Sequence, residues 1–490
     1  MRKVYGQLKD RTERNRERLS APEYCAPEIF GQGGGWSGDW QGRTILALAS
    51  LYKTEQDEDR KENILMQLDG ILNALDGQTN EDGYFGELFD GDAVNEQQLS
   101  GNSWFLRGLC AIYEIRKDVS VYDRLLRISE RYLSRLSQAY LRYPTVKREE
   151  GGVGGHLQST VGDGWLLSSD VGCAFILLDG ITHVYEITRD ERLLPVIRIM
   201  IKKFAAIDYV FYNCQTHAVL SGTRGVLRLY KLTGEKELLD LAVRNFRLYT
   251  EYGMTLNYAN FNWFGKPYWT EPCAIVDSFM IAQQLYAYTG ERRYAEFVNR
   301  CYLNAFRISQ RPNGGAGCET CLDERNDCLK NHFYEAFFCC SMRIAEGFFA
   351  LYENCVFQRQ DALYVIMPFS MDCDDMQLRA AERESGLDVE IMPLRNIPKL
   401  YFYIPSHCEV KGTFGKREGD MLVFEDLRER VRFSVEYLPF TERRQNREVH
   451  MKGDLVLLCG DRGDERTRTE IHDRFSLPDR NAVESLREYL

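Results

Sequence analysis

Three cysteines and one glutamate stand at spacings that could build a metal site. Cys339 and Cys340 are adjacent, and the short element Glu271-Pro-Cys273 precedes them by 66 positions. Thiolates and a carboxylate are ligands that zinc accepts in tetrahedral sites, closed for structure or left open at one position for chemistry. Neighbouring cysteines are poor disulfide partners, because one peptide step of about 3.8 Å is shorter than the Cα separation of about 4.4–6.8 Å that a disulfide favours. The pair is therefore interpreted as metal ligands or a reactive thiolate. The alternative is two buried apolar residues at the start of a helix.

A second group of potential ligands lies upstream of the cysteine pair. Cys318, Cys321, Cys328 and His332 fall within one short segment, and the C-x2-C spacing at its start is typical of a structural zinc site. The alternative is that these thiols line the mouth of the fold beside the glycine-rich segment 312–317. The sequence leaves open whether this group binds a second metal.

Composition limits the classes of function. The chain has 490 residues, 44% of them hydrophobic, which is enough for one large domain and a smaller one. Its net charge is −11 and it has no basic block that could follow phosphates, so nucleic acid is not an expected partner. Neither a membrane span nor a signal peptide is evident, so we expect a cytoplasmic protein that does not bind membranes. Its 15 cysteines are then buried thiols or metal ligands rather than a disulfide framework.

An internal repeat organises the chain as far as residue 355. Apolar helical stripes end in a Leu-Tyr-like pair, and turn signals follow some of them. The pairs are Leu51-Tyr52, Ile112-Tyr113, Val184-Tyr185, Leu229-Tyr230, Leu285-Tyr286 and Leu351-Tyr352. Six copies predict six helix pairs, and their uneven spacing favours a closed ring over an open solenoid. We therefore expect a mainly α protein with an (α/α)6 barrel over residues 31–355, after an N-terminal segment of residues 1–30.

The pattern changes after the last repeat to the period-two alternation of strands. The alternating segments are 362–369, 387–392, 399–404, 421–424, 431–437 and 453–459. They predict an antiparallel β-sandwich domain over residues 356–462, packed on the barrel. The charged tail 463–490 is expected to be partly helical or frayed.

Glycine-rich loops of the helical region combine tryptophan or tyrosine with acids and amides. The loops are 31–40, 80–86 and 151–165. Aromatic rings beside polar groups suit sugars, which present apolar C–H faces and hydroxyls. The alternative is that these aromatics only cap the barrel.

With these motifs the chain resembles glycoside hydrolase family 127, the bacterial β-L-arabinofuranosidases. Thr270-Glu-Pro-Cys273 stands where that family shows Glu-Thr-Cys, and Phe338-Cys-Cys-Ser341 stands where it shows a cysteine pair. The resemblance covers roughly residues 30–460, without the second β domain of the fullest family members. Glu319-Thr-Cys321 matches Glu-Thr-Cys literally, but it lies too near Cys339 to leave room for a helix pair between them.

The resemblance implies a zinc cofactor and the roles of its ligands. Glu271, Cys273, Cys339 and Cys340 would hold one zinc ion, and Cys339 would be the nucleophile of a retaining reaction. The implied chemistry is consistent with thiol acidity, because a free cysteine has a pKa of about 8.5 and zinc holds it as a thiolate at neutral pH.

The sequence departs from the family at the general acid and base. The family's glutamate precedes the zinc glutamate, where this chain has Thr255 and Leu256. Glu251 is the nearest candidate, and Glu335 and Glu319 are the fallbacks. Without a positioned acid, catalysis would lose about 10²–10⁴-fold.

The predicted function is a zinc-dependent retaining glycoside hydrolase that releases terminal β-L-arabinofuranose from small glycosides or oligosaccharides. His217, His156 and Asp170 are the expected contacts to this small carbohydrate substrate. Two alternatives are a catalytically silent zinc protein that binds sugar and a glycosidase of different sugar specificity. An epimerase or lyase would not need the cysteines. The sequence leaves the sugar, the linkage and homo-oligomer formation open.

Overall fold

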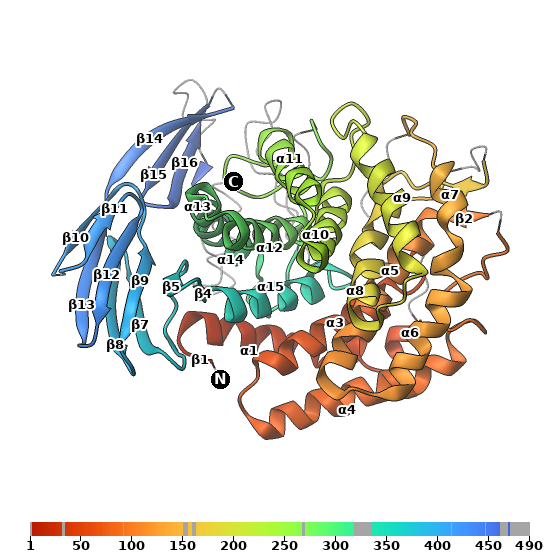
Figure 1. Cartoon of the computed structure of the whole chain (residues 1–490), viewed down its shortest axis with the longest axis horizontal. Helices are drawn as coiled ribbons and strands as arrows, with labels where there is room; N and C mark the ends of the chain where they lie inside the picture. The colour runs from red at the N-terminus through yellow and green to blue at the C-terminus, as the bar shows by residue number, and fades with distance from the viewer. Residues whose placement is uncertain are drawn as a thin grey trace.

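The computed structural model has a helix-rich first part and a β-sheet second part, as the sequence predicts (Figure 1). It describes residues 2–31, 35–91, 93–149, 155–158, 163–266, 270–317, 335–412, 414–445, 447–460 and 469–470. The second predicted ligand group, Cys318, Cys321, Cys328 and His332, lies outside the described residues, and so does Glu319. Most of the tail 463–490 lies outside them as well.

Helices of the first part contact one another in a closed cycle. Within the described residues the cycle consists of α3 (Asp39–Thr54), α5 (Glu96–Arg116), α8 (Leu177–Thr188), α10 (Thr216–Thr233), α12 (Pro272–Thr289) and α15 (Cys340–Asn354). Each packs on the next, and α15 packs back on α3. Every Leu-Tyr-like pair of the sequence repeat falls near the C-terminal end of a different helix of this cycle. The sequence repeat therefore marks the C-terminal half of every helix in this cycle.

A second set of helices packs on the outside of the cycle. It comprises α1 (Gln7–Leu19), α4 (Glu58–Ala74), α6 (Val119–Arg131), α9 (Leu193–Ala206), α11 (Lys236–Tyr252) and α13 (Arg292–Cys301). Shorter pieces complete the first part: α2 (Glu28–Gly31), α7 (Ser137–Leu141), α14 (Arg307–Ser309) and the strands β2 (Val94–Asn95) and β3 (Trp165–Leu166). Most of these outer helices bury one face, as amphipathic helices do, whereas α13 is buried on more than one side.

Small residues and caps explain how the inner helices fit so closely. Gly42 of α3 lies against α5, where an added Cβ would come within 2.1 Å of the Phe105 nitrogen. Asn95 caps α5 by accepting hydrogen bonds from the backbone of Gln97 and Gln98. Gly290 ends α12 at a φ of 71°, a left-handed conformation that glycine adopts without strain.

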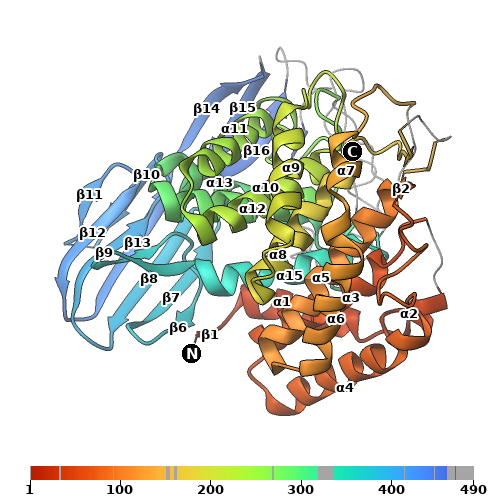
Figure 2. The same ribbon diagram turned by 45° about the vertical axis from the view of Figure 1, so that its right-hand side comes forward.

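The β part forms two large sheets and a smaller one in the described residues (Figure 2). The first has the order β1 (Lys3–Val4), β6 (Met371–Asp372), β7 (Met376–Arg383), β8 (Gly386–Pro393), β13 (Val431–Tyr437), β10 (Cys408–Lys411). The second has the order β11 (Lys416–Glu418), β12 (Met421–Leu427), β9 (Ile397–Tyr403), β5 (Ala362–Val365), β4 (Val356–Arg359). The third has the order β14 (Pro439–Arg444), β15 (Arg447–Lys452), β16 (Leu455–Gly460), β17 (Thr469–Glu470).

The prediction of antiparallel pairing is wrong for β5 and β9, which are parallel with Leu363 opposite Leu400. The reason is connectivity: after β5 the chain builds β6, β7 and β8 in the other large sheet and then returns as β9 in the same direction. The two large sheets contact each other through aromatic residues. The ring of Phe433 in β13 lies 5.2 Å from that of Phe402 in β9 and 5.9 Å from that of Phe424 in β12.

Several contacts join the two parts of the molecule. Strand β1, at the N-terminus, pairs with β6 of the β part, while α1 packs on α3 and α15. Arg300 of α13 binds Asp454, and the Asn304 side chain donates to the Asp454 carbonyl at 2.8 Å. In the part of the chain that the structure describes, no helix combines the length and apolar character needed to cross a membrane.

Candidate metal centre

The predicted ligands come together at the N-terminal ends of two adjacent inner helices. Glu271 is the N-cap of α12 and Cys273 lies in its first turn, while Cys339 is the N-cap of α15 and Cys340 its first residue. Because α12 packs on α15, the two short motifs meet. A helix N-terminus stabilises negative charge, so this position also favours thiolates and carboxylates.

The distances fit one tetrahedral ion. One donor atom of each of the four residues lies within 4.8 Å of the others. The Cys273 and Cys340 sulfurs are 3.8 Å apart, and those of Cys339 and Cys340 are 3.3 Å apart. Ligands at about 2.0–2.3 Å from a zinc ion stand roughly 3.3–3.8 Å apart along the edges of a tetrahedron. The donor set and its spacing therefore suit a zinc ion.

The electrostatics of the cluster favour a cation. Burial raises the pKa of Glu271, and the neighbouring Cys273 raises it further. Burial likewise raises the pKa of the Cys273 thiol, as does its neighbour Cys339. A divalent ion would reverse these shifts, since it favours the ionised form of each ligand.

Cys339 differs from the other two cysteines in exposure. Cys273 and Cys340 are completely buried, whereas Cys339 is only partly buried. Of these three cysteines, Cys339 is therefore the most accessible to a molecule in solution.

Hydrogen bonds fix the two motifs locally. The Asn260 side-chain oxygen accepts from the backbone of Glu271 and from the Thr270 hydroxyl, both at 3.0 Å. On the other side, the Ser341 hydroxyl donates to Glu335 at 2.7 Å. These contacts hold the chain in the irregular conformation that precedes each helix.

His217 lies behind the carboxylate ligand rather than at the surface. Its Nδ1 is 3.4 Å from Glu271 Oε1 and its Nε2 is 3.6 Å from Asp277 Oδ2. The ring stacks on Trp104 at 5.6 Å and is 2% exposed. Burial lowers the pKa of His217, but Glu271 raises it, and the net shift is upward. His217 is thus placed to orient Glu271, a common arrangement around metal ligands.

Arg43 of α3 approaches the cluster from another helix. Its Nη1 donates to Cys273 Sγ at 3.6 Å, and its Nε pairs with Asp39 Oδ1 at 2.6 Å. Its guanidinium carbon lies 4.0 Å from the ring centre of Trp104.

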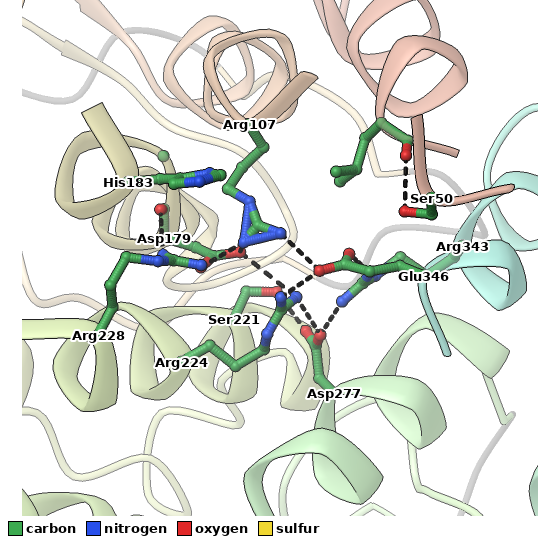
Figure 3. A network of polar contacts seen from close by, with 12 residues as sticks. Ser50, Arg107, Asp179, His183, Ser221, Arg224, Arg228, Asp277, Arg343 and Glu346 are labelled. Atoms are coloured by element: carbon green, nitrogen blue, oxygen red, sulfur yellow. Dashed lines mark hydrogen bonds and ion pairs between the residues drawn. The ribbon is translucent and has the colours of Figure 1, made fainter. Parts of the chain in front are cut away.

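A buried network of charges lies one helical turn deeper than the cluster (Figure 3). Asp277, on α12 like Cys273, binds Arg224 at 2.9 Å and also Arg343. Glu346 binds Arg224 and Arg343, and it binds Arg107 as well. Since charges buried this deeply must be paired, the network fixes the Asp277 carboxylate that faces His217.

The other predicted sugar contacts lie on the loop before α8. The side chain of His156 is exposed, and its backbone pairs with that of Ser169 at 2.9 Å. Asp170 is 3% exposed. Burial raises the pKa of Asp170 to about 7, and the charge of Glu271 also contributes, so this carboxyl group lies within electrostatic reach of the cluster.

The candidate acids occupy different surroundings. Glu251 is exposed near the C-terminal end of α11, where its neighbour Tyr252 is its hydrogen-bond partner. Glu335 is held by Arg18 at 2.7 Å and by Asn313 at 2.8 Å, in addition to Ser341.

Two aromatic rings from different elements meet near Cys339. Trp40 lies one turn before Arg43 in α3, and its ring meets that of Phe337 edge-on at 5.4 Å. Phe337, which is two positions before Cys339, is 39% exposed. These rings offer apolar surface next to the partly buried thiol.

Sequence reasoning missed Arg43, Asp39, Trp104 and Asp277. The i, i+4 spacing of Asp39 and Arg43 beside Trp40 is a readable signal of a helix-borne ion pair. Asp277 follows Cys273 by four residues in α12, a spacing that places both on one helix face. Nothing in the sequence indicates that Trp104 comes from another helix to the same place.

No protein-family model matches this sequence, and no curated protein does. Solved structures match it over most of its length. A family 127 β-L-arabinofuranosidase of Geobacillus stearothermophilus T6 matches 94% of this chain and 86% of its own, with a TM-score of 0.63 and 13% identity. A second family 127 β-arabinofuranosidase matches 91% and 79%, with a TM-score of 0.64 and 12% identity. A structure described as a glycoside hydrolase matches 93% and 82%, with a TM-score of 0.64 and 12% identity. The chain has the fold of these enzymes.

Proposed function

We propose that this protein is a zinc-dependent retaining glycoside hydrolase that releases terminal β-L-arabinofuranose from small glycosides or oligosaccharides. The observation that carries the proposal is the convergence of Glu271, Cys273, Cys339 and Cys340 within 4.8 Å. It occurs in a chain whose fold matches that of β-L-arabinofuranosidases over more than nine-tenths of its length.

The four ligands are proposed to hold one zinc ion. Zinc would keep the thiols ionised at neutral pH and fix their direction. Since Cys339 is the one partly exposed cysteine of the described cluster, it is the proposed nucleophile, while the fully buried Cys273 and Cys340 remain ligands.

The reaction of Cys339 takes place in two steps. In the first, its sulfur forms a bond to the anomeric carbon, the bond from that carbon to the leaving oxygen breaks, and a carboxyl group gives this oxygen a proton. In the second, the same carboxylate takes a proton from water, the water oxygen bonds to the anomeric carbon, and the sulfur leaves. Two inversions retain the configuration of the sugar.

The proton donor is the part of the proposal with two candidates. Glu251 is the donor expected from the sequence, and its position at the end of α11 requires the substrate to reach that exposed carboxyl group. Asp170 is favoured by its burial and by its electrostatic coupling to Glu271.

The proposed substrate contacts are His156 and Asp170, whereas His217, the third contact expected from the sequence, is buried behind Glu271 and is proposed to orient that carboxylate instead. Trp40 and Phe337 would pack on apolar faces of the sugar or of the leaving group.

The finer description of the fold is also proposed. We assign residues 31–355 to an (α/α)6 barrel, which the closed cycle of inner helices supports. Residues 356–462 are assigned to a β-sandwich, supported by the contacts of Phe433 with the opposite sheet. Residues 1–30 and 463–490 flank these domains.

Metal analysis of the purified protein, combined with a panel of aryl glycosides, tests the function. About one equivalent of zinc and hydrolysis of a β-L-arabinofuranoside are expected. Zinc without hydrolysis of any glycoside would favour the silent sugar-binding protein, and hydrolysis of another glycoside would change the assigned sugar. Absence of both zinc and activity would contradict the proposal.

A further inference from the structure

The ligand cluster carries more negative charge than one divalent ion can neutralise. Glu271 and three thiolates together carry four negative charges, and a divalent ion leaves two of them uncompensated. Buried charge of this kind must be paired with a nearby cation. Arg43 supplies such a cation, since its Nη1 lies 3.6 Å from Cys273 Sγ.

The surroundings of Arg43 leave its guanidinium little freedom. Asp39, one turn earlier in α3, binds Nε at 2.6 Å, and the Trp104 ring covers one face at 4.0 Å. The side chain is 6% exposed. One edge of the guanidinium is therefore held by Asp39, and Nη1 is directed at Cys273. An arginine guanidinium keeps its proton at any pH at which the protein is folded, so the group is a cation.

A hydrogen bond to a thiolate withdraws electron density from sulfur. The sulfur that accepts this hydrogen bond becomes a poorer nucleophile. It also dissociates from the metal less readily, because the metal and the hydrogen-bond donor both hold it in place. Cys273 and Cys339 are chemically identical ligands, so their different roles must come from their surroundings.

We propose that Arg43 is a positioning residue that holds Cys273 as a permanent metal ligand and so leaves the nucleophilic role to Cys339. This inference rests on the proposed function and extends it to a residue of α3. Asp39 and Trp104 act through Arg43 by fixing its direction.

Cobalt substitution gives a readout that does not depend on activity. Thiolate-to-cobalt charge transfer reports the electron density on sulfur, and loss of the Arg43 hydrogen bond should move this band to longer wavelength. Arg43→Met keeps the length of the side chain but removes the charge and the donors. We expect the red-shifted band, about 10–100-fold weaker metal binding in chelator competition, and a fall in kcat larger than any change in KM.

Two further variants separate this role from a purely structural one. Arg43→Lys keeps the charge without the planar fork and should restore part of the metal affinity. Asp39→Asn keeps Arg43 but removes the carboxylate charge that holds its guanidinium. This variant should also move the charge-transfer band to longer wavelength, by less than Arg43→Met does. If Arg43→Met does not fold, the band shift of Asp39→Asn decides whether Arg43 has this role.

The outcomes distinguish this inference from the proposed function. One outcome is that the wild-type protein binds cobalt but the charge-transfer band of Arg43→Met and Asp39→Asn stays in place or moves to shorter wavelength. This outcome would overturn the role of Arg43 alone. Wild-type protein that binds neither cobalt nor zinc would overturn the metal site and the role of Arg43 with it.

Discussion

At the residue scale, the cysteines of the cluster differ by burial and by their neighbours. Cys273 is fully buried and accepts a hydrogen bond from Arg43, whereas Cys339 is partly exposed beside Phe337 and Phe338. The chemistry of the sulfur atoms alone would not give Cys273 and Cys339 different roles. Their assigned roles therefore depend on side chains contributed by other elements.

Removing one buried ligand should abolish tight metal binding. Cys273→Ser and Cys340→Ser replace a thiolate by a hydroxyl group, which is a much poorer zinc ligand at neutral pH. Elemental analysis after dialysis should show less than about a tenth of the wild-type metal. Cys25→Ser, outside the cluster and half-buried, is the matched control and should keep a full equivalent. Full retention in both ligand variants would refute the assignment.

Leaving-group chemistry decides between the two candidate acids. The variant that lacks the true donor, Glu251→Gln or Asp170→Asn, should lose about 10²–10⁴-fold in kcat on alkyl or sugar aglycones, which need protonation. The same variant should lose much less activity on nitrophenyl glycosides, because their leaving group does not need protonation. Azide should restore turnover of the nitrophenyl substrate by replacing the activated water. Equal losses on both substrate types would indicate a structural role for the residue concerned.

The sequence predicts the ligands at this scale but not their supporting residues. The four ligands fall in two short motifs with recognisable residue types. Arg43 and Trp104 reach the same place from α3 and α5, and such convergence depends on how helices pack rather than on spacing along the chain. Burial of His217 behind Glu271 is likewise a consequence of packing.

At the element scale, the position of the cluster depends on the close fit of the inner helices. Gly42 lets α3 approach the backbone of α5, and both helices carry residues that contact the cluster or its support.

Gly42→Ala should therefore destabilise the fold. The added Cβ would lie 2.1 Å from the Phe105 nitrogen, so α3 and α5 must separate. We expect a loss of about 1–3 kcal/mol in the free energy of unfolding, measured by chemical denaturation, together with weaker metal binding. Gly70→Ala in α4, where an added Cβ meets nothing within 4 Å, is the control and should raise stability by about 1 kcal/mol. Equal behaviour of the two variants would contradict the packing argument.

The elements themselves were largely predictable. The Leu-Tyr-like pairs mark all the helices of the inner cycle, and the period-two segments overlap β5, β8, β9, β12, β13 and β16. The parallel pairing of β5 with β9 was not predictable, since period-two alternation shows which residues share a face but not which strand lies alongside.

At the scale of the whole molecule, the helical and β parts are joined through a buried ion pair. Arg300 binds Asp454 at 3.1 Å, and Tyr403 donates to the same carboxylate at 2.8 Å. The pairing of β1 with β6 ties the N-terminus to the β part as well. These contacts indicate that the two parts unfold together.

Breaking this junction should cost far more than breaking a surface pair. Arg300→Leu leaves Asp454 buried without its cation, so we expect a loss of about 3–5 kcal/mol and a split of the calorimetric transition in two. Arg428→Leu, which breaks an exposed pair with Asp426, should cost less than about 1 kcal/mol. A single unshifted transition in Arg300→Leu would show that the two parts do not depend on this contact.

The most direct test of the whole account is to identify the residue that bears the sugar during turnover. Rapid acid quench of the zinc-loaded protein with a nitrophenyl β-L-arabinofuranoside, followed by peptide mass spectrometry, should find one arabinosyl group on Cys339. Cys339→Ser should show neither the adduct nor turnover. An adduct confined to another residue, or a Cys339→Ser variant with wild-type turnover, would contradict the account.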